Sequence, residues 1–305
     1  MGSPGQPLGP GQRAPDFVLP RRDGTPTRFY AIAGGRPAVL VFRDAEVSLY
    51  DVDRSEPVEV LADPEGTVWT AYGVADGATA FVLDPNLRVL GTFELGDGEL
   101  ARPQVHALLD GAAPVLAPVL LIPNVLSERD CAWLIDVWAT QGSVETGVEE
   151  TREGHREERL SEAHKRRRDH TVTDPQVSAR IAGILGRALM PELRKAFAYR
   201  ATRFEGFKIG CYDAATGGFF RAHRDNLSPA TAHRRFALTL NLNDDYDGGQ
   251  LRFPEYGPHL YRPPAGGALV FSCAHLHEVL DVTGGRRFVL LSFLYGDESP
   301  RRPHA

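Results

Sequence analysis

The side chains best suited to chemistry are those of His223 and Asp225, which stand one residue apart in the stretch CYDAATGGFFRAHRDN, residues 211–226. Side chains alternate between the two faces of a β-strand, so residues i and i+2 project to the same side. On a strand, this imidazole and this carboxylate would therefore meet at one point. Two histidines and one carboxylate bind non-haem Fe(II) as a facial triad. The pair therefore predicts two ligands of an iron site, although the same spacing also suits a hydrogen-bonded pair at the surface.

The third ligand has two candidates, His275 and His277, within the apolar stretch ALVFSCAHLHEVLDV, residues 268–282. Alternation does not separate them, because both would project from the same strand face. The residues that follow favour His277. A Gly-Gly pair at 284–285 predicts a turn, and Arg287 follows on the next apolar strand, ten residues after His277. Because an arginine can grip a carboxylate through two N–H groups, Arg287 would suit the far end of a pocket that binds a dicarboxylic keto acid. His275 is then expected to be a structural neighbour of the metal.

Four segments around these residues resemble, in the same order, the iron(II)- and 2-oxoglutarate-dependent oxygenases of the prolyl 4-hydroxylase type. They read CYDAATGGFFRAHRDN, RFALTLNLNDDYDGGQLRF, YRPPAGGALVFSCAHLHEV and VTGGRRFVLLSF, and the resemblance covers residues 118–298. It implies a double-stranded β-helix, which is a jelly-roll barrel, with helices packed outside it. It also implies that His223, Asp225 and His277 bind Fe(II) in the mouth of this barrel.

The resemblance further implies how the cosubstrate 2-oxoglutarate is held. Arg287 would pair with its C5 carboxylate, and the neighbouring Arg286 would project to the opposite strand face. Tyr212 stands at a position whose hydroxyl group helps to hold the cosubstrate in the resembling family. Thr239 and Asn241 share a strand face with each other, so they would either line the same pocket or make only local bonds within the sheet.

The activity that the resemblance implies is the hydroxylation of an aliphatic C–H bond by O2, with release of succinate and CO2 and with ascorbate as a reductant. Related halogenases carry a small residue in place of Asp225, so its carboxylate favours hydroxylation. The substrate would be a residue in a protein or peptide, prolyl or other, or an amino-acid-like small molecule. The alternative is a non-catalytic binding or scaffold protein with a degenerate barrel, which would not explain the intact triad and Arg287.

Residues 14–112 alternate strand-like and turn-like stretches, which predict an α/β domain. The segments GQRAPDFVLPRRDG (11–24) and AYGVADGATAFVLDPNLRVLGTF (71–93) resemble the opening and closing parts of peroxiredoxins, which have a thioredoxin-like fold. That family carries its reactive cysteine shortly after the strand that PAVLVF matches, whereas this chain continues with RDAEVSLYDVD. A peroxidase of that kind needs a thiolate. The domain is therefore expected to be redox-inactive and to serve packing, dimer formation or substrate capture.

The chain of 305 residues is long enough for two domains with separate cores. We expect a tail at 1–13, the thioredoxin-like domain at 14–112, a linker at 113–118 and the oxygenase domain at 119–298. The net charge of −6 disfavours nucleic acid as the partner, and the apolar runs fall short of the roughly 20 residues of a membrane span. Three cysteines without C-x-x-C spacing predict no disulfide framework, and so a reducing, cytoplasmic compartment. The first domain could also support a homodimer.

The segment 144–170 carries charges of both signs with little apolar periodicity. It predicts either a solvated loop or frayed helix, or a lid over the metal site. Its basic run at 165–168 could bind nucleic acid, but neighbouring acidic residues offset the charge. Helices are expected at 127–142 and at 175–200, with a break near Pro191. The histidines outside these motifs are expected at the surface: His155, His164, His170, His233 and His259.

Overall fold

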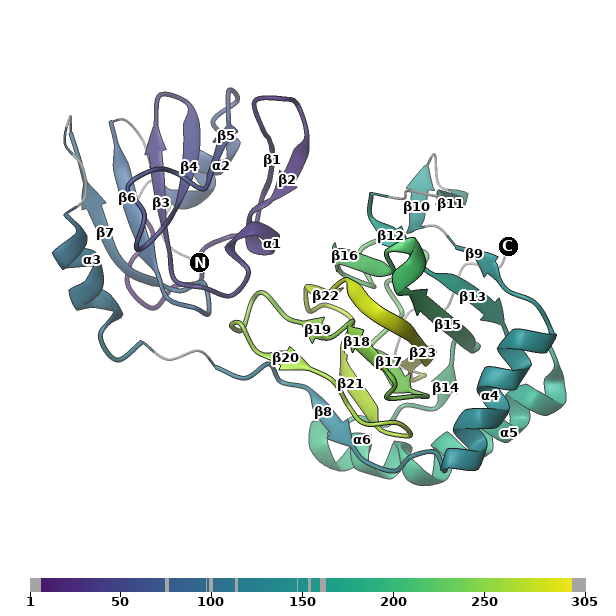
Figure 1. Ribbon diagram of the computed structural model, residues 1–305. Helices are drawn as coiled ribbons and strands as arrows, with labels where there is room; N and C mark the ends of the chain where they lie inside the picture. The colour runs from purple at the N-terminus through teal and green to yellow at the C-terminus, as the bar shows by residue number, and fades with distance from the viewer. Residues whose placement is uncertain are drawn as a thin grey trace. The chain divides into compact units, whose positions relative to one another are not determined.

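The computed structural model in Figure 1 describes residues 7–74, 77–96, 98, 101–112, 115–146, 148–152, 155–159 and 163–297. Two compact units make up the chain. The first contains Met1–Ala117 together with the short segment Phe253–His259, and the second contains Pro118–Arg252 and Leu260–Ala305. Each unit is therefore described by itself.

The first unit is built on one sheet whose strand pairs are all antiparallel. In spatial order its strands are β5 (Glu59–Ala62), β4 (Glu46–Asp51), β3 (Ala38–Arg43), β6 (Thr79–Leu83) and β7 (Val89–Glu94). The remaining elements are the hairpin β1 (Val18–Pro20) and β2 (Pro26–Arg28), and the helices α1 (Phe29–Ala33), α2 (Thr67–Tyr72) and α3 (Arg102–Leu109). Phe42, Tyr72 and Phe81 pack with ring centroids 4.9–5.4 Å apart and form the centre of this core.

The thioredoxin-like fold predicted for this unit is not confirmed. Strand β3 turns directly into β4 through Asp44 and Ala45, which both have positive φ angles of 52° and 60°. Positive φ at both central residues is what a tight type I′ hairpin requires. A thioredoxin-like unit would instead have a parallel strand–helix–strand crossover at this point. The hairpin occupies the stretch in which peroxiredoxins carry their cysteine, and all three free cysteines of the chain belong to the second unit.

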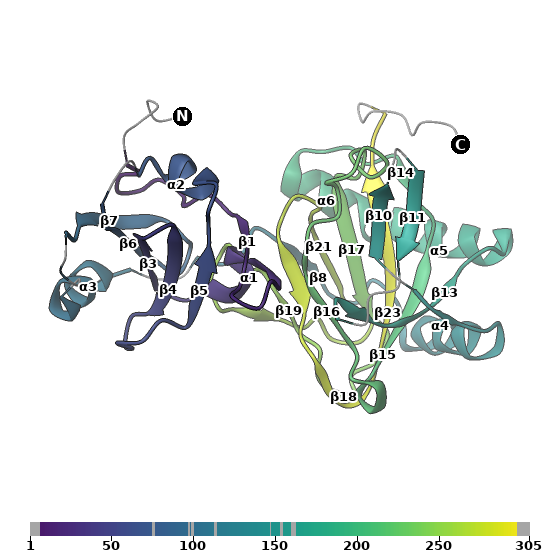
Figure 2. The ribbon, with the colours of Figure 1, turned by 90° about the horizontal axis from the view of Figure 1, so that it is seen from above.

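The second unit is mostly β-sheet, with two antiparallel sheets, as in a jelly roll. The larger sheet contains, in order, β8 (Leu120–Ile122), β21 (Ala268–Ser272), β17 (Phe236–Asn241), β23 (Val282–Tyr295), β15 (Lys208–Asp213), β13 (Arg168–Thr171) and β9 (Val144–Glu145), with β14 (Arg203–Phe204) and β18 (Tyr246–Gly248) also paired to β23. The smaller sheet contains β12 (Lys165–Arg166), β16 (Phe219–His223), β22 (His277–Val279), β19 (Leu251–Arg252) and β20 (Leu260–Tyr261). Figure 2 shows the long strand β23 running beside β17 and β15 through the larger sheet.

Three helices cover the larger sheet of the second unit: α4 (Glu128–Thr140), α5 (Pro175–Ala188) and α6 (Met190–Phe197). The Ser127 side chain caps α4 by accepting a hydrogen bond from the backbone N–H of Asp130, and the Asp174 side chain caps α5 in the same way. The apolar faces of the helices share one buried core with the sheet, in which Leu134 and Leu185 lie with Leu290. The two predicted helical regions are thus confirmed.

Two sequence expectations about this unit are wrong. The segment 144–170 is neither loop nor helix where it is described, because it forms β9, β12, β13 and a hairpin of β10 (Val148–Arg152) and β11 (His155–Arg159). The pair Gly284–Gly285 makes no turn, because β23 runs straight through it and pairs there with β18. The chain instead passes from the smaller to the larger sheet at 280–281, between β22 and β23. No helix in the described part of the chain is long and apolar enough to cross a membrane.

Candidate metal centre and its pocket

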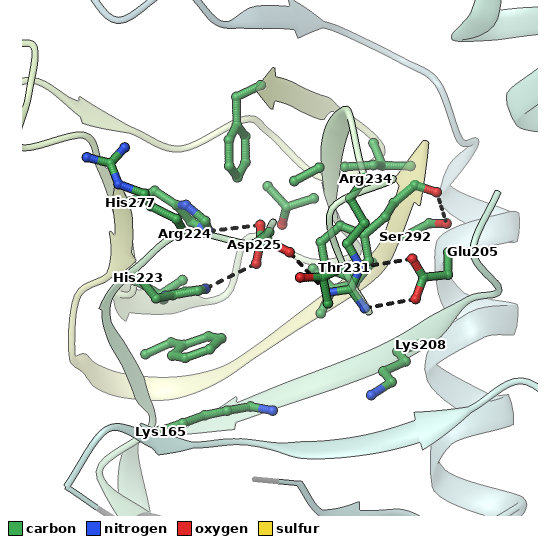
Figure 3. Close-up of a pocket in the computed structure, with 18 of the residues that line it drawn as sticks. Lys165, Glu205, Lys208, His223, Arg224, Asp225, Thr231, Arg234, His277 and Ser292 are labelled. Atoms are coloured by element: carbon green, nitrogen blue, oxygen red, sulfur yellow. Dashed lines mark hydrogen bonds and ion pairs between the residues drawn. The ribbon is translucent and has the colours of Figure 1, made fainter. Parts of the chain in front are cut away.

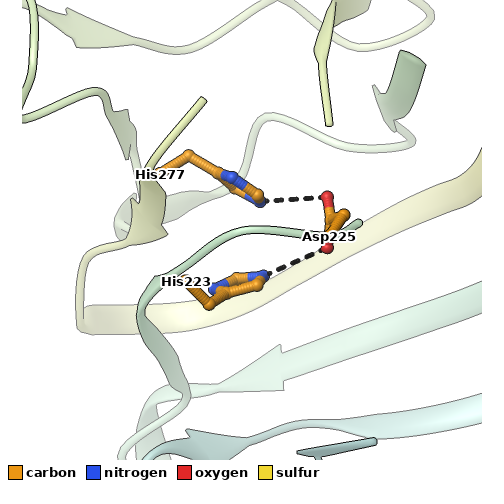
Figure 4. Close-up of side chains that lie close together, drawn as sticks. All are labelled: His223, Asp225 and His277. Atoms are coloured by element: carbon orange, nitrogen blue, oxygen red, sulfur yellow. Dashed lines mark ion pairs between the residues drawn. The ribbon is translucent and has the colours of Figure 1, made fainter. Parts of the chain in front are cut away.

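His223, Asp225 and His277 converge on one point, with one potential ligand atom from each lying within 4.8 Å of the others. Figure 4 shows the two imidazoles facing the carboxylate. His223 Nε2 lies 3.5 Å from Asp225 Oδ1, and His277 Nε2 lies 3.4 Å from Asp225 Oδ2. The structure therefore brings together the three side chains predicted as iron ligands.

The reason for this convergence differs from the strand alternation expected from the sequence. The two histidines are cross-strand partners, because β16 and β22 pair with His223 opposite His277. Strand β16 ends at His223, so alternation does not extend to Asp225. Asp225 is placed instead by its backbone N–H, which donates to the carbonyl oxygen of Cys273 at 3.0 Å, just beyond the end of β21. A bulge in β16 also turns Phe220 to the same side as His223. The two rings stack with their centroids 3.6 Å apart.

Hydrogen bonds fix which ring nitrogen of each histidine faces the carboxylate. Nδ1 of His223 lies 2.8 Å from the carbonyl oxygen of Arg221, and Nδ1 of His277 lies 3.0 Å from that of His275. A carbonyl oxygen only accepts, so each Nδ1 carries the proton and each Nε2 of a neutral ring keeps its lone pair. Backbone carbonyls orient metal-bound histidines in this way. Three electron-pair donors that face one another with no hydrogen between them fit a cation at their centre.

The charge states of the cluster also suit a metal. Burial, with the neighbouring His223, lowers the pKa of His277 from 6.5 to about 4, so this imidazole is neutral at pH 7. Burial alone would raise the pKa of Asp225, but the two imidazoles and the guanidinium of Arg234 lower it from 3.8 to about 2. Neutral imidazole and ionised carboxylate are the forms that bind divalent iron.

A cavity of about 390 Å³ opens beside the triad between the two sheets. Its size is that of a small-molecule site. Figure 3 shows the triad in its wall, together with charged side chains from the strands and loops around it. Its apolar lining comes from both sheets: Phe220, Leu251 and Val279 from the smaller, and Leu238, Phe271 and Leu291 from the larger.

The residues predicted to hold 2-oxoglutarate gather on the larger sheet. Tyr212 and Thr239 line the cavity. Arg287, which is 1% exposed, lies against both of them: its Nη2 donates to Thr239 Oγ1 at 3.5 Å, and its guanidinium carbon lies 5.4 Å from the centre of the Tyr212 ring. Arg287 Nη1 is buried and has no hydrogen-bond partner among the described residues. Because the contacts of this buried cation are with neutral groups, the site fits an anionic ligand.

Asn241 is completely buried and supports Arg287 from behind. Its Oδ1 accepts hydrogen bonds from Arg287 Nη2 at 3.0 Å and Nε at 3.3 Å. Its Nδ2 donates to the hydroxyl group of Tyr246 at 2.9 Å. Neither Asn241 nor Arg287 is among the described residues that line the cavity, and Arg287 lies against two residues that do, Thr239 and Tyr212. Arg286 is exposed, on the face opposite to Arg287, as strand alternation predicts.

Two site residues were missed by the sequence analysis, which placed them in a solvated basic run. Lys165 and Arg167 are 6% and 9% exposed, and both line the cavity. Arg167 grips Asp169 through two hydrogen bonds of 2.6 and 2.7 Å, and its Nη1 donates to the hydroxyl group of Tyr212 at 3.0 Å. The signal was the spacing Lys-x-Arg-x-Asp, because a period of two on a strand puts all three side chains on one face.

A second buried ion pair, between Arg234 and Glu205, holds the chain segment that follows Asp225. Arg234 donates to both carboxylate oxygens of Glu205 at 2.8 Å, and His233 Nε2 lies 2.7 Å from the same carboxylate. Arg234 Nη1 also donates to the backbone oxygen of Asp225 at 3.3 Å. His233 and His170 are 2% and 8% exposed, so the expectation that they lie at the surface is wrong. No local sequence pattern marked Glu205 as the partner of His233 and Arg234, because it lies on a separate segment.

Residues 207–295, which include the whole triad and Arg287, match the family model described as the 2OG-Fe(II) oxygenase superfamily. A PKHD-type hydroxylase from a Synechococcus strain is 30% identical over 122 residues, which are 38% of this chain and 54% of that protein. A PKHD-type hydroxylase from Hyphomonas neptunium is 40% identical over 76 residues, which are 24% of this chain and 33% of that protein. The chain thus spans about half the length of the first of these relatives.

Among solved structures, the chain is similar to an oxidoreductase of the 2OG-Fe(II) oxygenase family from Burkholderia pseudomallei, at 19% identity with a TM-score of 0.45, over 69% of this chain and 98% of that one. It is also similar to a Pseudomonas putida prolyl-4-hydroxylase, at 19% identity with a TM-score of 0.43, over 59% of this chain and 92% of that one. The family-model match therefore supports a 2OG-Fe(II) oxygenase domain at residues 207–295, and this family implies Fe(II), 2-oxoglutarate and O2.

Proposed function

We propose that residues 119–298 form a dioxygenase that uses Fe(II) and 2-oxoglutarate to hydroxylate an aliphatic C–H bond, with release of succinate and CO2. The observation that carries this proposal is the pairing of two features, a cluster that lines the cavity and a buried cation that lies against two other lining residues, Tyr212 and Thr239. One is the cluster of His223, Asp225 and His277, whose donor atoms face a common point. The other is the buried guanidinium of Arg287, whose Nη1 has no hydrogen-bond partner among the described residues.

The first feature would hold the metal. Three protein ligands on one face of an Fe(II) ion leave the remaining positions for ligands from solution. The backbone carbonyls that accept from the two Nδ1–H groups keep His223 and His277 in the metal-binding tautomer. Arg234 donates a hydrogen bond to the backbone oxygen of Asp225, which would hold this loop and its carboxylate in place.

The second feature would hold the cosubstrate. Arg287 would receive the C5 carboxylate of 2-oxoglutarate, with Asn241 keeping the guanidinium in place. The hydroxyl oxygen of Tyr212 already accepts a hydrogen bond from Arg167, so its own proton is directed elsewhere and can be donated to the same carboxylate. The hydroxyl group of Thr239, in contact with Arg287, would be a further neighbour of the carboxylate.

When bound, iron with 2-oxoglutarate and O2 supplies the oxidising power for the C–H bond. The protein positions the substrate and keeps the cavity dry. Apolar side chains from both sheets, including Phe220, Val279 and Leu291, exclude water around the triad. The substrate would be a residue of a peptide or protein, or an amino-acid-like small molecule.

The test is turnover of the full chain with Fe(II), 2-oxoglutarate and O2. The proposal predicts that the purified protein converts 2-oxoglutarate to succinate and CO2, at a slow rate without substrate and faster with it. His223→Ala should abolish this conversion. If the metal-loaded wild-type protein releases no succinate under any of these conditions, the proposal is wrong.

A further inference from the structure

The cavity beside the triad carries more positive charge than the proposed reaction needs. Among the described residues, the basic side chains that line it are Lys165, Arg167, Lys208, Arg224 and Arg234. Its acidic lining consists of Glu205 and Asp225. A ferrous ion brings two positive charges and 2-oxoglutarate brings two negative ones, so loading the site leaves this excess of cations unchanged. Arg287, which sits beside the cavity, adds to it.

Lys165 has the position from which a cation can act on a substrate at the metal. It lies on β12, directly opposite Phe220 of β16, and its Nζ is 5.4 Å from the centre of the Phe220 ring. That ring stacks on the imidazole of His223. One aromatic ring therefore separates the ammonium group from a metal-binding residue. Figure 3 shows the side chain of Lys165 extending into the cavity below His223 and Asp225.

The cation is held in place by a buried polar cluster. Lys165 Nζ donates to Thr146 Oγ1 at 2.6 Å and lies 3.6 Å from Asp169 Oδ2. Thr146 in turn donates to Asp169, and Arg167 takes both oxygens of the same carboxylate. Burying charges costs free energy unless they are well paired. Here two buried cations contact one carboxylate, so the cluster carries a net positive charge at the cavity wall when counted over the described residues.

We propose that the substrate carries a carboxylate group, which binds at Lys165 and Arg167 while the carbon to be hydroxylated lies over the metal. The inference rests on the function proposed above and names the substrate class. A carboxylate at this wall completes the charge balance of the buried cluster. The apolar ring of Phe220, between the cations and the triad, would receive the aliphatic part. The carboxylate can belong to a free acid of the amino-acid type or to an acidic side chain of a peptide.

Matched acids and amides test this proposal with the full chain loaded with Fe(II) and 2-oxoglutarate under argon. The first arm uses N-acetylproline and N-acetylleucine, each as the free acid and as the primary amide. The second arm uses pentapeptides with both ends blocked, with glutamate or glutamine in the middle. The dissociation constant of each probe is read from its effect on the visible absorption of the iron complex. In air, succinate release is measured with the same probes.

The proposal predicts that in at least one arm the acid binds at least about tenfold more tightly than its amide, the usual effect of one partly buried charge pair. The arm that shows this preference identifies the source of the carboxylate. Lys165→Met should remove the preference while 2-oxoglutarate itself still binds, and Lys165→Arg should retain most of it. Arg166→Met is the matched control, because Arg166 is the next residue of β12 and does not line the cavity.

Three results would overturn the proposal. The first is that acids and amides bind equally well to the wild-type protein in both arms, a comparison that needs no variant. The second is that Lys165→Met keeps the full preference for acids. The third is that Lys165→Met loses the absorption change on binding 2-oxoglutarate, which would assign Lys165 to the cosubstrate. Failure of the proposed function is distinguishable, because wild-type protein would then show no absorption change with Fe(II) and 2-oxoglutarate at all.

Discussion

Replacing Arg287 by methionine should abolish tight binding of 2-oxoglutarate while leaving the fold almost as stable as before. Most truncations of a fully buried charged side chain destabilise a protein strongly, because the partner charge is left unpaired. Arg287 differs, because the described groups around it are neutral: Thr239, Asn241 and the ring of Tyr212. The guanidinium is therefore placed for a ligand rather than for a partner within the protein.

The magnitudes follow from these contacts. Removing one member of a buried, hydrogen-bonded charge pair costs roughly 2–5 kcal/mol of binding free energy, which raises the dissociation constant at least about 30-fold. In the unliganded protein, the Oδ1 atom of Asn241 loses its hydrogen bonds from Arg287, at a cost of about 1–3 kcal/mol. The variant no longer buries a cation among neutral groups, which offsets much of that loss. We expect a net change in the free energy of unfolding of less than about 2 kcal/mol.

Urea denaturation under argon measures both the stability of the unliganded protein and the stabilisation that 2-oxoglutarate adds on binding. At a concentration of 2-oxoglutarate about 100 times the wild-type dissociation constant, and with Fe(II) present, binding should add about 2.7 kcal/mol to the stability of the wild-type protein. The variant should gain less than about 1 kcal/mol. Arg286→Met is the matched control, because Arg286 precedes Arg287 and is exposed. If 2-oxoglutarate stabilises Arg287→Met as much as wild type, the assignment of Arg287 to the cosubstrate is refuted.

Five further substitutions probe the rest of the site. His223→Ala and Asp225→Ala should lose iron on gel filtration, measured by elemental analysis. His275→Ala should keep most of it, because the bond from His275 to His277 is made by its main-chain oxygen, which the substitution keeps. Loss of iron from His275→Ala alone would contradict the ligand set. Arg167 lowers the pKa of Asp169 from 3.8 to about 2, although burial alone would raise it. The ionised carboxylate therefore adds roughly 2 kcal/mol to the free energy of unfolding above pH 3.8. This contribution is lost as the pH falls towards 2. Urea unfolding across this pH range should show this loss of stability in wild type and not in Asp169→Asn. If the free energy of unfolding changes with pH in the same way in both proteins, this role of Asp169 is refuted. Tyr212→Phe should raise the dissociation constant of 2-oxoglutarate about threefold to tenfold through one lost hydrogen bond, and an unchanged value would remove its hydroxyl group from the site.

The sequence predicted the members of the triad cluster better than the geometry that assembles them. His223 and His277 stand out because their residue types are rare and their spacing to Arg287 is informative. Their actual relation, as partners across β16 and β22, depends on pairing between segments more than 50 residues apart. Asp225 lies beyond the end of its strand and is placed by a backbone bond to Cys273. Such long-range bonds leave no local pattern in the chain.

The segment 144–170 shows why charge alone misled the prediction. A run of mixed charges suggests solvent exposure, since isolated charges are costly to bury. Here the opposite charges of Arg167 and Asp169 pair with each other, which lets both side chains lie inside. The alternation of Lys165, Arg167 and Asp169 was visible in the sequence, but the strands that pair with this segment, β16 and β15, were not.

In the first unit, the sequence located strands and the closing helix but not their connectivity. Apolar runs and turn residues mark the segments that form β3, β6, β7 and α3. Strand β4 carries no such mark, because its apolar residues alternate with polar and charged ones. The resemblance to peroxiredoxins suggested a thioredoxin-like domain, which is not confirmed, and Asp44 and Ala45 make a tight hairpin between β3 and β4.

The most direct test of the central claim is anaerobic titration of the full chain with Fe(II) and then with 2-oxoglutarate. If His223, Asp225 and His277 bind iron and leave positions open for the keto acid, a visible charge-transfer band should appear and saturate at one equivalent per chain. The band should be absent in Asp225→Ala. A folded wild-type protein that shows no band at saturating iron and 2-oxoglutarate would contradict the account.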